Sequence, residues 1–114
     1  MEPKARFKII YSDETIEFLN TLDEKARVKI MYNVNKSKYV IDKELFKKLD
    51  DTEGIWEFRT LYNGITYRLL AFWDTDKEAL VLTTHGFIKK SQKTPSKDIT
   101  KAEEIRKAYF NSKK

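Results

Sequence analysis

The feature that most constrains the fold is a change of apolar period at Ile55, where apolar and charged residues begin to alternate. A period of two is typical of a strand with one buried face. Asn63 and Gly64 then form a strong hairpin signal, because both accept the positive φ angles of a tight turn. Residues 66–73 are predicted as the returning strand, and residues 79–87 as a third strand after a further turn. The pattern predicts an antiparallel meander.

Capping residues predict two helices ahead of the meander. Ser12 precedes two carboxylates, which favour the positive end of a helix dipole, and an apolar stripe follows at helical spacing. Asp23 begins a second helix in the same way, so the two helices are expected to form an antiparallel hairpin. A short strand is expected at residues 7–11 and a helical turn around residues 45–49.

A third helix is predicted after the meander, with Thr94 as its N-cap and Pro95 as its first residue. This order of helices, strands and a closing helix indicates an α+β fold with an antiparallel sheet. The 114 residues are enough for one hydrophobic core and too few for two. Residues 1–114 are therefore predicted to form a single domain.

The composition excludes several classes of protein. The chain has no cysteine, so disulfide frameworks, Cys-based zinc sites and thiol chemistry are excluded, and a reducing cytoplasm is the expected location. The longest apolar run, Leu69 to Trp73, is far shorter than the roughly 18 residues that span a bilayer. One histidine and scattered carboxylates show no metal-ligand spacing, so neither a metal nor another cofactor is expected.

Positive charge is concentrated at the end of the chain. The net charge is +5, and the segment from Gly86 to Lys114 holds nine Lys and Arg residues against three Asp and Glu. A solvated basic tail would also be rich in lysine, but here aromatic and glycine residues lie among the charges. The segment is predicted to meet a polyanion such as nucleic acid, an acidic protein or a membrane surface.

Three charged residues of the first hairpin are candidates for phosphate chemistry. Alternation places Glu57 and Arg59 on the face opposite the aromatic residues, and the hairpin brings Arg68 near them. The guanidinium fork binds two phosphate oxygens and stays charged, so Arg59 and Arg68 are predicted to bind phosphate. The alternative for Arg59 is an ordinary pair with a carboxylate. Glu57 is a candidate base, or else the salt-bridge partner of an arginine.

The third strand and the loop after it supply three more candidates. His85 is the only histidine, and an imidazole is suited to carry a proton near neutral pH, although a lone histidine near a strand end is often structural. Lys89 and Lys90 follow, and as adjacent cations at the end of a strand they are candidates to contact a polyanion. The alternative for both lysines is a solvated loop.

These motifs occur together in an order and spacing that resemble the phage-derived, HigB-like branch of the RelE toxin superfamily. They are the segments Gly54–Arg59, Tyr67–Arg68, His85–Lys90 and Gln92–Pro95 and a closing helix with Ala102, Arg106 and Tyr109. The likeness covers roughly residues 5–110. It implies a helical hairpin packed on a small curved antiparallel sheet, with a C-terminal helix. It also aligns Arg59 and Arg68 with functional basic residues of RelE-type toxins, and Lys89 and Lys90 with a paired lysine of the family. At least one of these lysines is therefore expected to contact RNA or the transition state of its cleavage.

The resemblance implies the toxin of a type II toxin-antitoxin system, a metal-independent mRNA endonuclease that acts on ribosome-associated mRNA. The related ParE branch has the same fold and inhibits DNA gyrase without cutting nucleic acid, which is the alternative function. The basic pairs Arg59/Arg68 and Lys89/Lys90 favour the nuclease. The implied partners are a cognate antitoxin with a HigA-like helix-turn-helix, mRNA and the ribosome, and no membrane partner is expected.

Overall fold

The computed structural model describes residues 3–113. Met1, Glu2 and Lys114, which the single-domain prediction includes, lie outside the described residues. The elements of the described part, in chain order, are β1 (Lys8–Ile10), α1 (Asp13–Asn20), α2 (Glu24–Ser37), β2 (Phe46–Lys48), β3 (Trp56–Tyr62), β4 (Ile65–Trp73), β5 (Leu80–Lys89) and α3 (Ser96–Asn111). The predicted α+β fold is confirmed, with a helical hairpin between β1 and the rest of the sheet and a helix last.

The strands form one sheet in the order β1-β5-β4-β3-β2. The meander β3-β4-β5 is antiparallel as predicted, and Asn63 and Gly64 take φ angles of 53° and 77° at its first turn. β1 pairs in parallel with β5, so the sheet is mixed and the expectation of an antiparallel sheet is wrong at this strand. A parallel pair needs a long crossover, and the helical hairpin with three strands supplies it.

Strand β2 replaces the helical turn predicted around residues 45–49. The amides of Leu45 and Phe46 both donate to the carbonyl of Asp42, which makes a single turn, and residues 46–48 then pair with β3. Phe46 stacks on Phe58 with 4.1 Å between ring centroids. Pairing with β3 buries Phe46 and satisfies the backbone, and these tertiary gains outweigh the local helical spacing.

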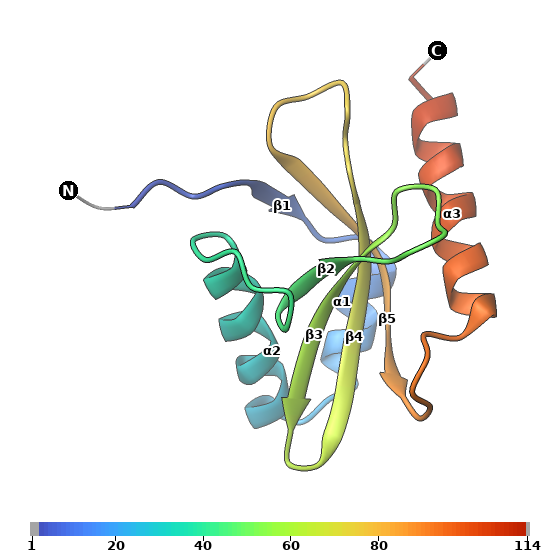
Figure 1. Cartoon of the computed structure of the whole chain (residues 1–114). Helices are drawn as coiled ribbons and strands as arrows, with labels where there is room; N and C mark the ends of the chain where they lie inside the picture. Colours follow the sequence, from blue (N-terminus) through green and yellow to red (C-terminus); the bar gives the residue numbers. More distant parts are fainter. Residues whose placement is uncertain (1–2, 114) are drawn as a thin grey trace.

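The helices cover both faces of the sheet (Figure 1). On one face α1 and α2 pack over a core that includes Phe7, Ile30 and Phe58. On the other face α3 covers a smaller apolar cluster around Phe72 and Ala102. No helix within residues 3–113 has both the length and the apolar character needed to cross a bilayer.

Two of the three predicted helix caps are confirmed. The side chains of Ser12 and Asp23 accept hydrogen bonds from the amides of Thr15 and Ala26, at 3.0 and 2.8 Å. The prediction for α3 is wrong, because its N-cap position is Pro95 and no side chain caps it. The hydroxyl of Thr94 donates to the carboxylate of Glu57 instead.

Candidate active site

Strand register brings the predicted charged residues onto one face of the sheet. Arg59 lies opposite Arg68 in the β3-β4 pair, and Lys47 of β2 lies opposite Glu57 of β3. Because directly paired residues of neighbouring strands share a face, these side chains lie on the face that also carries α3. Lys89, at the end of β5, lies opposite Thr66 on the same face. Four strands therefore supply the charges of one site.

Glu57 is the centre of this cluster. Its side chain is almost completely buried, with an Oε1 atom 3.0 Å from Nε of Arg68 and 3.6 Å from Nε of Arg59. Neither contact has hydrogen-bond geometry, so both are ion pairs. The Thr94 hydroxyl donates to Oε2 and ties the loop before α3 to the sheet. Burying a carboxylate without such partners would lower the free energy of unfolding. The same contacts fix the orientation of the two arginines.

Arg68 is buried as well. Its Nη1 atom donates to the carbonyl of Tyr67 at 3.2 Å. Burial lowers the pKa of Arg68, the charge of Arg59 lowers it further, and the charge of Glu57 opposes both effects. Two arginines around one carboxylate leave excess positive charge, which favours a bound anion.

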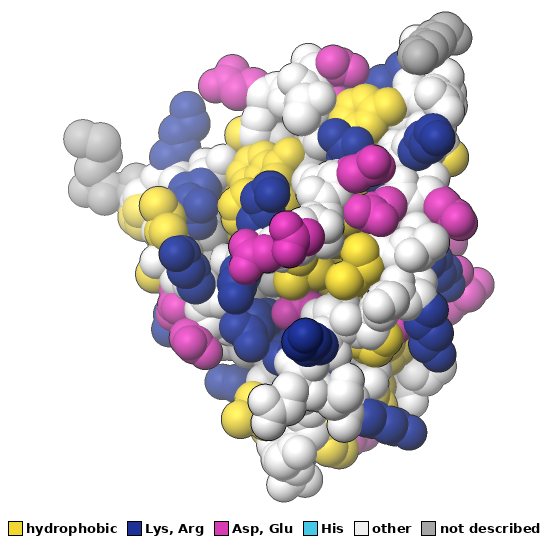
Figure 2. All heavy atoms as spheres, turned by 45° about the vertical axis from the view of Figure 1, so that its right-hand side comes forward, with side chains coloured by type: hydrophobic (Ala, Val, Ile, Leu, Met, Phe, Trp, Pro, Cys, Tyr) yellow, Lys and Arg dark blue, Asp and Glu magenta, His cyan; other side chains and the backbone are white. Residues whose placement is uncertain are grey.

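An open groove passes over this cluster, with a volume of about 470 Å³. Its polar and charged lining includes Lys47, Asp50, Asp51, Glu57, Arg59, Lys89, Gln92, Lys93 and Thr94. Burial lowers the pKa of Lys89, and the charges of Arg68, Arg59 and Lys47 lower it further against the opposing charge of Glu57. Figure 2 shows the side of the molecule that carries α3, where Lys and Arg side chains gather with acidic side chains among them.

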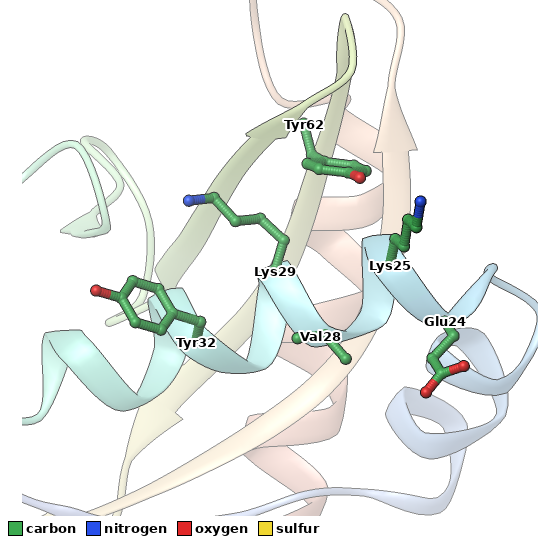
Figure 3. Close-up of a pocket in the computed structure, with 6 residues that line it drawn as sticks. All are labelled: Glu24, Lys25, Val28, Lys29, Tyr32 and Tyr62. Atoms are coloured by element: carbon green, nitrogen blue, oxygen red, sulfur yellow. The ribbon is translucent and has the colours of Figure 1, made fainter.

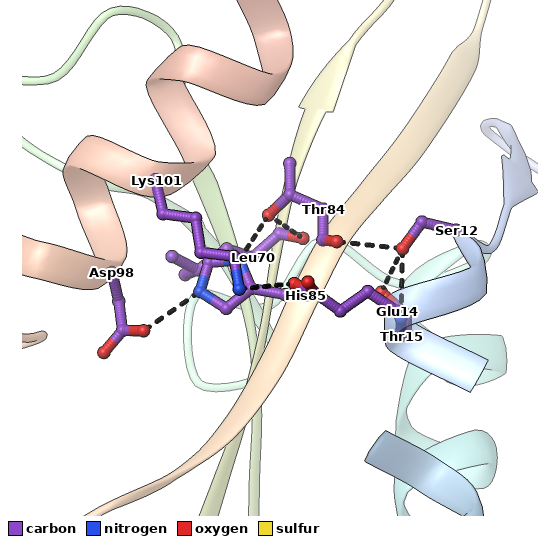
Figure 4. Close-up of polar contacts among 8 residues, drawn as sticks. All are labelled: Ser12, Glu14, Thr15, Leu70, Thr84, His85, Asp98 and Lys101. Carbon is purple, nitrogen blue, oxygen red and sulfur yellow. Dashed lines mark hydrogen bonds and ion pairs between the residues drawn. The ribbon is translucent and has the colours of Figure 1, made fainter. Parts of the chain in front are cut away.

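Arg68 lines a smaller neighbouring pocket that shares Arg59 with the groove. His85 and Lys90 lie apart from both hollows. His85 is buried, with Nε2 3.0 Å from Oδ1 of Asp98 in α3 and Nδ1 3.1 Å from Oγ1 of Thr84 (Figure 4). These contacts fasten α3 to β5, which is the structural alternative for a lone histidine. Lys90 is exposed and does not line the groove. The structure thus brings together Glu57, Arg59, Arg68 and Lys89, and separates His85 and Lys90 from them.

Lys47 and Thr94 belong to the site but were not predicted as site residues. Lys47 was missed because its segment was expected to be helical, and only the pairing of β2 with β3 places it beside Glu57. Thr94 was interpreted as a cap because it precedes Pro95. A Ser or Thr hydroxyl before a helix has two possible uses, and sequence alone does not distinguish them.

A wider hollow lies on the opposite side of the sheet, between α2 and the end of β3. Figure 3 shows Tyr62 on the side of α2 from which the Lys25 and Lys29 side chains rise. Its volume is about 640 Å³, but it contains none of the predicted site residues. The charged side chains of Lys47, Glu57, Arg59 and Lys89 line the smaller groove, which we therefore regard as the candidate active site.

Residues 17–107 match the family described as phage derived protein Gp49-like. The chain belongs to this family. The Gp49-like chain also has the fold of an arginine double mutant of the E. coli toxin RelE, solved in the free state. The TM-score is 0.57 at 13% sequence identity, over 90% of this chain and 98% of the RelE chain. No curated protein sequence matches the chain.

The family match bears out the phage-derived part of the resemblance, and the RelE structure bears out its fold. The finer placement in the HigB-like branch stays a prediction. Within residues 3–113, no three side chains of His, Cys, Asp or Glu converge as a metal site would require. That the site works without a metal or another cofactor stays a prediction.

Proposed function

We propose that this Gp49-like chain is the toxin of a type II toxin-antitoxin pair and that it cleaves mRNA in the groove over Glu57. The observation that carries the proposal is the convergence of Lys47, Arg59, Arg68 and Lys89 around one buried carboxylate. A groove lined by fixed cations is suited to a substrate whose backbone is a chain of phosphates.

The proposed reaction is attack of a ribose 2′-hydroxyl on the adjacent phosphorus, in which the hydroxyl proton is released to solvent water. The bond to the 5′-oxygen of the next nucleotide breaks, which leaves a 2′,3′-cyclic phosphate and a 5′-hydroxyl. Negative charge grows on the phosphate oxygens during the attack, and cations already in place stabilise it without reorganisation. Arg59 is the half-exposed arginine and contacts the phosphate directly, whereas buried Arg68 adds to the positive field.

Lys89 is the proposed proton donor to the leaving 5′-oxygen. Burial and neighbouring cations lower its pKa, which makes its ammonium group a stronger acid than a solvated lysine. Glu57 is a positioning residue in this scheme, because its two oxygens are already held by arginines and Thr94. The ribosome holds the mRNA in the conformation for attack, which explains a site without a complete acid-base pair.

The proposed partner of the toxin is a cognate antitoxin with a HigA-like helix-turn-helix. An acidic or apolar segment of that antitoxin would cover the basic groove and keep RNA out. The location proposed for both proteins is the cytoplasm, where ribosome-bound mRNA is present.

The test compares two adjacent lysines that the structure separates. The chain is expressed inducibly in bacteria, and new mRNA 5′ ends are mapped for the wild type, Lys89→Gln and Lys90→Gln. We expect new 5′ ends and growth arrest from the wild type and from Lys90→Gln. Lys89→Gln should lower cleavage by about a hundredfold, which is typical of losing a positioned acid or a charge-stabilising group.

Equal cleavage by both variants would refute the proposed role of Lys89. Growth arrest without new 5′ ends would instead favour a ParE-like inhibitor of DNA gyrase. Cleavage of ribosome-bound and of free mRNA by the purified chain then tests the ribosome requirement, and equal rates on both substrates would contradict it.

A further inference from the structure

A second pocket lies at the β2 edge of the sheet, beside the groove. Its volume is about 330 Å³, and its lining includes Arg6, Phe46, Lys48 and Trp56. Lys47 and Asp50 line both the pocket and the groove, so the two hollows adjoin. A ligand that fills the groove can therefore continue into the pocket.

The geometry of β2 connects the two hollows. β2 is the last strand of the sheet, so no further strand blocks the way around it. Lys47 lies opposite Glu57 and Lys48 lies opposite Trp56 in the β2-β3 pair. Because successive side chains of a strand point to opposite faces, Glu57 and Trp56 lie on the two sides of one short edge. An extended single strand can pass around this edge and contact both sides.

The pocket combines cations with aromatic surface. Nη1 of Arg6 donates to the carbonyls of Ser37 and Val40, at 2.8 and 3.3 Å, so the guanidinium is held in place. Lys43 and Lys48 add two exposed ammonium groups. These three cations can neutralise the phosphates of a nucleic acid backbone.

Trp56 supplies the aromatic part of the lining. It is half-buried and packs on Phe46 and Trp73, with ring centroids 4.8 and 5.8 Å away. Contact with aromatic side chains is how proteins commonly bind the bases of single-stranded RNA. The carboxylates of Asp42 and Asp50 also line the pocket and can accept hydrogen bonds from base amino groups.

We infer that this pocket is a second RNA subsite, which holds a nucleotide flanking the cleaved phosphate with its base against Trp56 and its phosphate near Arg6, Lys43 and Lys48. The inference rests on the proposed function, because it extends the path of the same RNA strand. It adds a binding site that none of the predicted catalytic residues touches.

The experiment uses the full chain and a short single-stranded RNA with 2′-O-methyl riboses, which cannot undergo the 2′-hydroxyl attack. The pocket variant is Lys43→Glu with Lys48→Glu. The matched control is Lys77→Glu with Lys107→Glu, which makes the same change in net charge at exposed positions that line neither hollow. We expect the pocket variant to bind about tenfold more weakly than the control, with a shallower salt dependence.

A second measurement locates the base. RNA that carries 4-thiouridine is cross-linked to the wild-type chain, and the attached peptide is identified by mass spectrometry. We expect the cross-link on the segment that contains Trp56. Equal affinity of the two double variants, or cross-links confined to residues 89–94, would overturn the subsite. Either result would leave the proposed nuclease standing, because that function is read independently from mRNA 5′ ends.

Discussion

Glu57 lies buried between Arg59 and Arg68, and its charge holds Arg59 at the wall of the groove and Arg68 in the adjoining pocket. Replacing it with glutamine leaves nearly the same volume but removes the negative charge. Arg68 would then be buried without a counter-ion, a change that costs about 3 kcal/mol when a buried pair loses one partner.

The corresponding prediction is that Glu57→Gln lowers the free energy of unfolding by about 3 kcal/mol, measured by urea denaturation. Glu78→Gln, at an exposed position, is the control and should change stability by less than about 0.5 kcal/mol. Equal stability of Glu57→Gln and the wild type would mean that the ion pairs do not hold the arginines in place.

Sequence reasoning succeeded at residues whose position follows from local alternation. Glu57 and Arg59 share a face because they are two residues apart in a strand, and the Asn63-Gly64 turn brings Arg68 opposite Arg59. Lys47 could not be found this way, because its place depends on a strand pairing between distant segments. The positions of His85 and Lys90 relative to Glu57 also required the fold, since His85 is buried and contacts Asp98 of α3.

At the scale of elements, α1 packs closely against β5 at Gly86. A Cβ atom at this position would lie 2.3 Å from Cδ2 of Phe18 and 2.7 Å from Cδ2 of Leu69. Neither ring nor methyl group can move away without disturbing the core, so the absence of a side chain at Gly86 sets the distance between helix and sheet.

We therefore expect Gly86→Ala to lower the free energy of unfolding by about 2 kcal/mol, the usual cost of overpacking. Gly64→Ala is an informative comparison, because open space surrounds Gly64 and only its φ of +77° opposes a side chain. That variant should cost about 1 kcal/mol. If Phe18→Leu in the Gly86→Ala chain restores no stability, the close contact with Phe18 is not the cause.

The last turn of α3 is fixed to the turn after β4 through Asp74. The side chains of Tyr109 and Lys113 donate to its Oδ2 at 2.5 and 2.6 Å, and the amide of Asp76 donates to Oδ1 at 2.8 Å. Burial alone would raise the pKa of Asp74, but these hydrogen bonds outweigh it and lower the pKa to about 2. Protonation of Asp74 at acid pH should therefore weaken the attachment of α3.

Because the pKa of Asp74 is lower in the folded chain than in the unfolded one, its contribution is complete above about pH 4. The contribution disappears as the pH falls through about 2. Asp74→Asn should thus be less stable than the wild type at neutral pH, and the difference should shrink toward pH 2. Unfolding curves across this pH range test the prediction, with Glu78→Gln at an exposed position as the control. A difference that is constant with pH would rule out the titration of Asp74 as its cause.

Local signals predicted the elements that close within a few residues, namely the helical hairpin and the β3-β4 turn. Two strands depended on distant partners. β1 pairs with β5, some seventy residues later in the chain, and β2 contains an apolar spacing that also suits a helix. For such segments the sheet that receives them decides the conformation, and no pattern within the segment reveals it.

In the folded molecule, the positive charges are grouped differently from the way they are grouped along the sequence. The last quarter of the sequence carries the excess of lysine, but among its described residues, 86–113, Lys89 and Lys93 are the only lysines that line the groove. Lys47, Arg59 and Arg68 come from earlier strands, whereas Lys107 is exposed on α3. The folded sheet, rather than a basic tail, therefore makes the surface proposed to bind RNA.

This difference is measurable in the salt dependence of RNA binding. Each phosphate that a protein neutralises on a single strand contributes about −0.7 to the slope of log K against log salt concentration. Contacts from Lys47, Arg59 and Lys89 together give a minimum slope of about −2. Lys89→Gln should make the slope shallower by about 0.7, whereas Lys107→Gln should leave it unchanged. An equal change of slope in the two variants would indicate that RNA affinity depends only on the net charge of the protein. The groove would then have no special role in binding.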